Sequence, residues 1–276
     1  MNVLTKFDLS NNIALVTGGA GLLGVQHCEA LLEAGSEIII LDIDMKALER
    51  CEKIFMSKYN KKVFTVCADI TKEDEIQSAK EKIYEKFNAY PSILINNAAI
   101  DAKYETNNKI NKTRLEDFDL AQWNIEISVG LSGAFLCSKH FGAEMAKMNK
   151  GVILNISSDL GIIAPSQFLY EDAELDSEKQ TVKPVTYSVI KHGLIGLTRY
   201  ISTYWAKNGV RCNAMAPGGA FNNHDKKFTD ELSKLIPMGR MADVDEYKAT
   251  IVYLCSNASS YMNGAVISID GGRTAW

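Results

Sequence analysis

The sequence predicts an α/β fold in which a doubly wound parallel sheet carries helices on both faces. Short β-branched apolar runs alternate with longer segments of helical periodicity, the pattern that produces parallel βαβ units. The apolar runs are continuous, as expected for strands covered on both faces. A glycine-rich turn joins the first run to the first helical segment. Because right-handed crossovers place the carboxyl ends of all the strands at one edge, we expect ligands to bind there.

The periodicity predicts seven strands and six helices in alternation. The strands are expected at Ile13–Thr17, Glu37–Asp42, Val63–Asp69, Ile93–Asn96, Val152–Ser157, Arg211–Ala216 and Ala265–Ile269. The helices are expected at Leu22–Ala34, Met45–Tyr59, Lys72–Phe87, Phe118–Met148, Tyr187–Ala206 and Val244–Ser256. No repeat or linker interrupts this order, so we expect one dinucleotide-binding and catalytic domain over residues 1–276.

Three segments show neither strand nor helix periodicity. Ala102–Glu116 is polar, Pro165–Pro184 is acidic, and Gly218–Met238 follows the end of a strand. Long loops inside a compact domain are usually functional or mobile. We therefore expect an insert at 164–184 and a lid at 218–238 to lie over the active site.

Composition excludes several classes of partner. The net charge is −4 with no basic block, which predicts no nucleic-acid partner. No apolar run approaches the roughly 20 residues that cross a bilayer, and no signal peptide is evident, so we expect no membrane association. The six cysteines form no C-x-x-C pair and the four histidines do not cluster. These features predict a cytoplasmic protein with no disulfide and no metal site.

The glycine turn Thr17–Gly24 lies between the first strand and the first helix. Glycines in such a turn let backbone N–H groups approach a pyrophosphate, and the following helix N-terminus adds a favourable dipole. This pattern predicts a dinucleotide site that includes Gly18, Gly21, Leu22, Leu23 and Gly24.

Polar residues at the next strand ends extend this site. Asp42 closes the second strand, and its carboxylate can accept both ribose hydroxyls while repelling a 2′-phosphate, which favours NAD over NADP. Asp69 can bind the adenine amine or cap the next helix, and the residue type leaves both open. The remaining predicted cofactor contacts at these strand ends are Ile43, Ile70, Asn97, Ala98 and Ala99.

Tyr187 and Lys191 form a Tyr-x-x-x-Lys pattern in the predicted helix Tyr187–Ala206. Residues four apart share one face of a helix, so the phenol and the ammonium can approach one site together. A nearby cation favours the phenolate over the phenol. Such a tyrosine can exchange a proton with an alcohol or a ketone near neutral pH.

Taken in order, these motifs resemble the short-chain dehydrogenase/reductase family over nearly the whole chain. The matching pieces are Thr17–Gly24, Asp42, Asp69, Asn96-Asn97-Ala98, Ser157-Ser158, Tyr187-x-x-x-Lys191, Pro217-Gly218 and Ile269-Asp270-Gly271-Gly272. The resemblance implies a single Rossmann-type domain, a nicotinamide cofactor and a homotetramer.

The resemblance also implies roles for individual residues. Tyr187 is the expected general acid/base, Lys191 favours its phenolate and binds the nicotinamide ribose, and Ser158 polarises the substrate oxygen. Ser158 is preferred over Ser157 because it lies three residues before Gly161. The expected contacts on the nicotinamide side are Pro217, Gly218 and Ala220.

Three departures from the family pattern stand out. Leu22 occupies a usual glycine position, so Gly19 and Gly21 are expected to carry the turn's flexibility. Gly130 stands where the family has an asparagine that holds a proton-relaying water. The segment between Ser158 and Tyr187 is longer than usual. These departures resemble, more loosely, bacterial flagellin-modification and surface-sugar oxidoreductases, which implies a sugar phosphate or a nucleotide-linked sugar as substrate.

The leading interpretation is an NAD-dependent alcohol/ketone oxidoreductase with a small-molecule substrate. A 3-oxoacyl thioester reductase is an alternative, although such an enzyme is expected to use NADPH, whose binding Asp42 disfavours. A small-alcohol or steroid dehydrogenase fits the acidic insert poorly. A non-catalytic NAD-binding regulator is the alternative from another class, suggested by the missing asparagine. The acidic insert would repel anionic sugars unless Lys183, Lys191 or Arg240 compensates.

Overall fold

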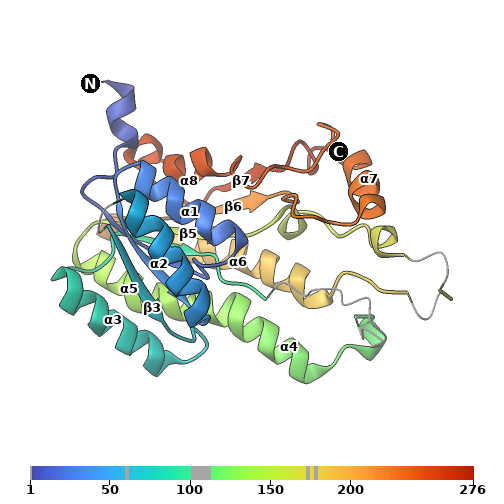
Figure 1. Cartoon of the computed structure of the whole chain (residues 1–276), viewed down its shortest axis with the longest axis horizontal. Helices are drawn as coiled ribbons and strands as arrows, with labels where there is room; N and C mark the ends of the chain where they lie inside the picture. The colour runs from blue at the N-terminus through green and yellow to red at the C-terminus, as the bar shows by residue number, and fades with distance from the viewer. Residues whose placement is uncertain (1, 60–61, 101–112, 172–174, 177–179) are drawn as a thin grey trace.

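Seven parallel strands form one sheet in the computed structural model, which describes residues 2–59, 62–100, 113–171, 175–176 and 180–276. The strand order is β3-β2-β1-β4-β5-β6-β7, a doubly wound, Rossmann-type arrangement (Figure 1). The predicted fold class is confirmed. The strands are β1 (Ile13–Thr17), β2 (Glu37–Asp42), β3 (Val63–Cys67), β4 (Ile93–Asn96), β5 (Gly151–Ile156), β6 (Val210–Pro217) and β7 (Val266–Ile269).

The helices cover both faces of this sheet (Figure 1). One core cluster joins one face to α1 (Leu22–Glu33), α2 (Met45–Tyr59) and α8 (Lys248–Cys255). A second cluster joins the other face to α3 (Glu73–Phe87), α5 (Gly133–Lys147) and α6 (Val185–Tyr204). Along β2, Ile38 and Ile40 belong to the first cluster, whereas Ile39 and Leu41 belong to the second. Alternate residues thus enter opposite cores, which explains why the strand sequences are continuously apolar.

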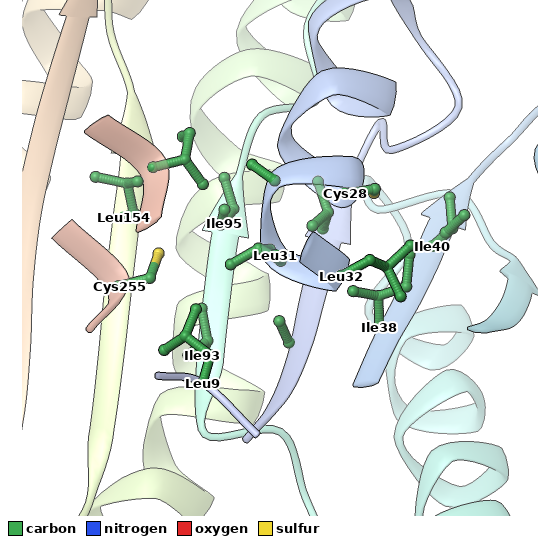
Figure 2. Close-up of a cluster of buried hydrophobic side chains, with 14 of the residues drawn as sticks. Leu9, Cys28, Leu31, Leu32, Ile38, Ile40, Ile93, Ile95, Leu154 and Cys255 are labelled. Atoms are coloured by element: carbon green, nitrogen blue, oxygen red, sulfur yellow. The ribbon is translucent and has the colours of Figure 1, made fainter. Parts of the chain in front are cut away.

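Helix α1 packs directly over the centre of the sheet. Figure 2 shows its residues Leu31 and Leu32 beside Ile38, Ile40 and Ile95 of the neighbouring strands, and all five side chains are buried. This packing fixes the N-terminal end of α1, and with it the glycine turn, at the carboxyl edge of β1.

The predicted helix Phe118–Met148 is confirmed as one unbroken helical run, but its type changes in the middle. It consists of α4 (Leu120–Ile127), a π-helical turn over Ser128–Ser132, and α5. The periodicity did not predict the π-helical turn. Helix α8 also begins later than predicted, because Glu246 folds back onto Asp243 in a turn before it.

Helix α7 (Lys226–Lys234) lies within the segment predicted as a lid. Its N-cap Asp225 accepts hydrogen bonds from the backbone N–H groups of Lys227 and Phe228. The C-terminus of the chain lies beside α7 (Figure 1), where the Trp276 indole N–H donates to the Leu235 carbonyl at 3.2 Å.

Most of the predicted loop Ala102–Glu116 and part of the acidic insert lie outside the described residues. Across the part that is described, no helix has the length and apolarity to span a bilayer. Over the same ranges, no three His, Cys, Asp or Glu side chains are placed to hold a metal ion.

Candidate active site

One cavity of about 1150 Å³ opens at the carboxyl ends of the strands. It exceeds the ~300–1,000 Å³ of an ordinary small-molecule site, which leaves room for a dinucleotide and a second small ligand. Every residue that the sequence placed in the site lines it: Gly18, Gly21, Leu22, Leu23, Gly24, Asp42, Ile43, Asp69, Ile70, Asn97, Ala98, Ala99, Ser158, Tyr187, Lys191, Pro217, Gly218 and Ala220. The topology brings these segments together, while their individual roles stay predictions.

The glycine turn is closed too tightly for side chains. Gly18 adopts φ +59°, and a Cβ on Gly24 would lie 2.2 Å from the Gly18 carbonyl oxygen. Gly18 therefore supplies the left-handed conformation of the turn. Gly19 also has no room for a side chain, because a Cβ on it would lie 2.9 Å from the Val16 carbonyl oxygen. Gly21 precedes α1 as its N-cap, and a Cβ there would meet only the Gly18 oxygen, at 3.3 Å. The turn thus leaves open the approach that a pyrophosphate would need.

Asp42 is held in the cavity by backbone N–H groups. Its Oδ2 accepts from Ala20 at 3.1 Å, and its Oδ1 accepts from Asp44 at 3.1 Å. The carboxylate therefore ties the end of β2 to the glycine turn and does not simply face solvent.

Asp69 lies at the cavity and holds a local turn. It lines the cavity, and its Oδ1 accepts from the backbone N–H and the hydroxyl of Thr71. Helix α3 begins at Glu73 with Lys72 as its N-cap, so Asp69 stabilises the preceding turn but does not cap the helix.

Asn97 bridges the ends of β1 and β4. Its Nδ2 donates to the Thr17 and Gly18 carbonyls, both at 3.0 Å. The neighbouring Ala98 packs against Gly18, where any Cβ would approach the Ala98 Cα to 2.7 Å. The Asn-Ala pair therefore forms the floor beneath the glycine turn.

Tyr187 and Lys191 occupy one face of α6, as predicted. Lys191 is buried, and its Nζ donates to the Ile156 carbonyl at 2.8 Å while lying 5.6 Å from the centre of the Tyr187 ring. Lys183 approaches the same ring, with its Nζ 4.0 Å from the centre. The structure thus brings two ammonium groups close to the Tyr187 ring.

The two adjacent serines have different partners. The Ser157 hydroxyl donates to the Lys191 backbone carbonyl at 2.8 Å and ties β5 to α6. The Ser158 hydroxyl donates to the Asp159 carboxylate at 2.7 Å and accepts from the Leu160 N–H. Burial raises the pKa of Asp159 despite these hydrogen bonds. Because a hydroxyl rotates, Ser158 can redirect its proton toward a ligand oxygen.

The Ile190 side chain packs directly against Gly130. Gly130 lies in the π-helical turn, and a Cβ on it would meet Ile190 Cγ2 at 2.7 Å. A small cavity of about 20 Å³ remains beside them, lined in part by Tyr187, Lys191 and the buried Glu126. Glu126 accepts hydrogen bonds from Gln122 and Thr186. The bulk of Ile190 explains why no asparagine side chain fits at residue 130.

Gly130→Ala is expected to destabilise the protein by about 1–3 kcal/mol, because the new methyl group overpacks against Ile190. Gly196→Ala is the matched control, since that glycine lies in α6 and a Cβ added to it would meet no atom within 4 Å. Thermal unfolding of both variants measures this loss of stability. Adding Ile190→Ala to Gly130→Ala should remove the clash and recover part of the lost stability. Equal melting temperatures for Gly130→Ala and the parent would contradict the packing described for this pair.

Sequence reasoning placed the insert and the lid over the active site and considered Lys183, but it did not assign the other residues that close the substrate side of the cavity. These residues lie in the insert, in or just after the lid, and in the tail: Ser166, Leu169, Tyr170, His224, Phe228, Leu232, Met241 and Arg273. The length of the insert and of the lid is a sequence signal for the residues that they carry, whereas Arg273 has no such signal. Of the cations considered for the acidic insert, Lys183 and Lys191 line the cavity, whereas Arg240 pairs with Glu246 instead.

Comparison with known proteins agrees with this geometry. A family model described as enoyl-(acyl carrier protein) reductase matches residues 21–274. A 2-dehydro-3-deoxy-D-gluconate 5-dehydrogenase of Bacillus subtilis is 30% identical, covering 96% of each chain. A galactitol 2-dehydrogenase (L-tagatose-forming) of Cereibacter sphaeroides is 30% identical over 100% of both chains. A 3-oxoacyl-(acyl-carrier-protein) reductase of Aquifex aeolicus is 30% identical, covering 97% of this chain and 99% of its own.

Solved structures give the same result. A gluconate 5-dehydrogenase from Burkholderia cenocepacia, in complex with NADP and tartrate, superposes with a TM-score of 0.85 at 26% identity over 100% of both chains. A short-chain dehydrogenase from Leptospira borgpetersenii with bound NAD+ has a TM-score of 0.80 at 28% identity, covering 98% of this chain and 95% of that one. The chain belongs to the short-chain dehydrogenase/reductase family and is an NAD(P)-dependent oxidoreductase that acts on CH–OH groups.

Proposed function

We propose that this enzyme interconverts a secondary alcohol and a ketone on a polyhydroxylated small molecule, with NAD as its cofactor. The observation that carries the proposal is the placement of Tyr187, Lys191 and Ser158 around one cavity with the glycine turn and Asp42. A bound nicotinamide would supply the hydride chemistry. The protein's own groups would orient the substrate and move its proton.

In the oxidative direction, the Tyr187 phenolate would take the proton of the substrate hydroxyl. Lys191, held by the Ile156 carbonyl, stabilises that phenolate. The Ser158 hydroxyl would turn from Asp159 toward the substrate oxygen and hold it against Tyr187. In the reductive direction, the same groups would deliver the proton.

Asp42 supports the choice of NAD. Its carboxylate faces the cavity beside the glycine turn, where it would accept ribose hydroxyls and repel a 2′-phosphate. The solved relatives with NADP and with NAD+ indicate that the fold accommodates either cofactor.

The polar side chains that lie among apolar ones on the substrate side support an oxygen-rich substrate. Ser166, Tyr170, Lys183, His224 and Arg273 offer hydrogen-bond donors there. Relatives named for a sugar acid and for galactitol fit this lining. A sugar phosphate or a nucleotide-linked sugar, as in surface-glycan or flagellin modification, remains a narrower prediction. We also propose that the segments 164–184 and 218–238 cover this side of a single domain, in a cytoplasmic enzyme.

A 3-oxoacyl thioester reductase remains the second candidate, because one relative carries that name. The non-catalytic regulator is set aside, since the chain belongs to an enzyme family and keeps Ser158, Tyr187 and Lys191. The proposal is tested by measuring turnover of the purified protein with NAD+ or NADP+ and a panel of aldonates and alditols. A second assay uses NADH or NADPH and a 3-oxoacyl thioester. Activity confined to the thioester would favour the second candidate.

We predict a homotetramer, with exposed apolar groups on α4, α5 and α6 as the reason. The helices cover part of each other, because Ile127 and Leu131 pack against Leu194. Phe135, Tyr200 and Tyr204 nevertheless remain at least half exposed in the single chain. Light scattering is expected to give four times the 30.5 kDa chain mass. A stable monomer at micromolar concentration would contradict this prediction.

A further inference from the structure

The C-terminal tail turns back and places Arg273 in the active-site cavity. Gly271 and Gly272, at φ +63° and +90°, reverse the chain directly after β7. The Asp270 carboxylate holds the turn by accepting from the Gly272 N–H, the Thr274 N–H and the Thr274 hydroxyl, at 3.0, 3.0 and 2.6 Å. The position of Arg273 is therefore fixed by its own backbone and not left to a mobile end.

The Arg273 guanidinium is buried and incompletely bonded. The residue is only 6% exposed, and its Nη2 donates to the Ser166 hydroxyl at 3.1 Å. Its Nε–H has no hydrogen-bond acceptor within the described parts of the chain. Buried donors are rarely left without an acceptor, so this group points to a ligand that binds in the cavity. An oxyanion matches best, because guanidinium N–H pairs bind carboxylate and phosphate oxygens in parallel.

The surrounding charges leave this side of the cavity able to accept an anion. Lys183 lines it as a second cation beside Tyr187. Asp159 is the facing acid, and its Oδ1 already accepts from Ser158 and Leu160. Asp270 is engaged in the tail turn, and the exposed Glu171 does not line the cavity. Within the described residues, Arg273 and Lys183 thus bring positive charge to this side of the cavity, beside the buried Asp159.

We propose that Arg273, with Lys183 and Ser166, binds an oxyanion at the end of the substrate, so that the enzyme prefers an anionic polyhydroxylated substrate over the neutral polyol. This inference rests on the proposed alcohol oxidation and narrows its substrate class. The oxyanion can be a carboxylate, as in an aldonate, or a phosphate, as in a sugar phosphate. Both place the reacting hydroxyl a few carbons away, near Ser158 and Tyr187.

The test compares substrates that differ only at C1: D-gluconate, D-glucitol and D-glucitol 1-phosphate. In Arg273→Gln, kcat/KM for the preferred anion is expected to fall about 10–10²-fold, from the loss of charge-assisted hydrogen bonds. The value for D-glucitol is expected to stay within about threefold of the parent, since that terminus carries no charge. A fall for gluconate alone assigns a carboxylate, and a fall for the phosphate alone assigns a phosphate.

Two further variants keep the test decisive. Arg273→Lys retains the charge but removes the Nε–H, and it should lose part of the anion preference even if Arg273→Gln folds poorly. Arg240→Gln is the matched control, because that arginine pairs with Glu246 away from the cavity. Arg240→Gln should leave kcat/KM for all three substrates unchanged.

Equal losses for anionic and neutral substrates in Arg273→Gln would overturn the inference, as would a parent enzyme that prefers D-glucitol. Either result leaves the proposed alcohol oxidation standing. Absence of turnover with every alcohol would instead contradict the proposed function. Calorimetry with tartrate and its neutral counterpart threitol then tests the anion site by itself. Tartrate binding that Arg273→Gln abolishes supports the site, and equal binding by both proteins contradicts it.

Discussion

Replacing Tyr187 with phenylalanine is expected to lower turnover by about 10²-fold or more, while folding and NADH binding are retained. The ring and its contacts with the Lys183 and Lys191 ammonium groups remain, so the packing of α6 is preserved. Only the hydroxyl that we propose exchanges a proton with the substrate is removed. Steady-state turnover with the best alcohol of the panel, together with fluorescence titration of NADH, measures the two effects separately.

Tyr200→Phe is the matched control for this prediction. Tyr200 lies on the same helix but is exposed and does not line the cavity. Its variant should retain the parent rate. A Tyr187→Phe enzyme that also retained the parent rate would show that another group moves the proton.

Asp42→Ala is expected to weaken NADH binding by about 10–10²-fold and to narrow the difference between NADH and NADPH. The change removes the carboxylate that we propose accepts the ribose hydroxyls and repels a 2′-phosphate. It also removes the hydrogen bond from Ala20 that ties β2 to the glycine turn. Titration of both reduced cofactors into the parent and the variant measures these effects.

Asp42→Asn separates the two contributions. It keeps an acceptor for the Ala20 N–H but lacks the negative charge, so the turn should stay intact while NADPH binds better than it does to the parent. If the parent protein itself bound NADPH more tightly than NADH, the assignment of Asp42 as the determinant of NAD preference would be wrong.

The sequence predicted the cofactor half of the molecule well because that half is built from local patterns. A strand, a glycine turn and a helix must follow one another in the chain, and the topology then fixes where Asp42 and Asn97 lie. The Tyr187–Lys191 pair is equally local, since both residues share one turn of α6.

The substrate half depends on contacts between distant segments and could not be predicted in this way. Arg273 and Ser166 are 107 residues apart, and neither local sequence predicts the hydrogen bond between them. The steric fit between Gly130 and the Ile190 side chain likewise cannot be predicted from sequence, because it depends on how two helical segments pack. Helix α7 did carry local signals, in its N-cap Asp225 and in the i, i+4 apolar pair Phe228 and Leu232, but it is only nine residues long and the notable length of its segment predicted a loop.

Transfer of a labelled hydrogen tests the central claim most directly. The alcohol that turns over best would be prepared with deuterium on the carbon that bears the reacting hydroxyl, and incubated with NAD+ and the purified enzyme. We predict that this deuterium appears on the nicotinamide C4 of the reduced cofactor, and that Tyr187→Phe slows its appearance about 10²-fold or more. Reduced cofactor that forms without the label, or labelled cofactor that forms at the parent rate in Tyr187→Phe, would contradict this mechanism.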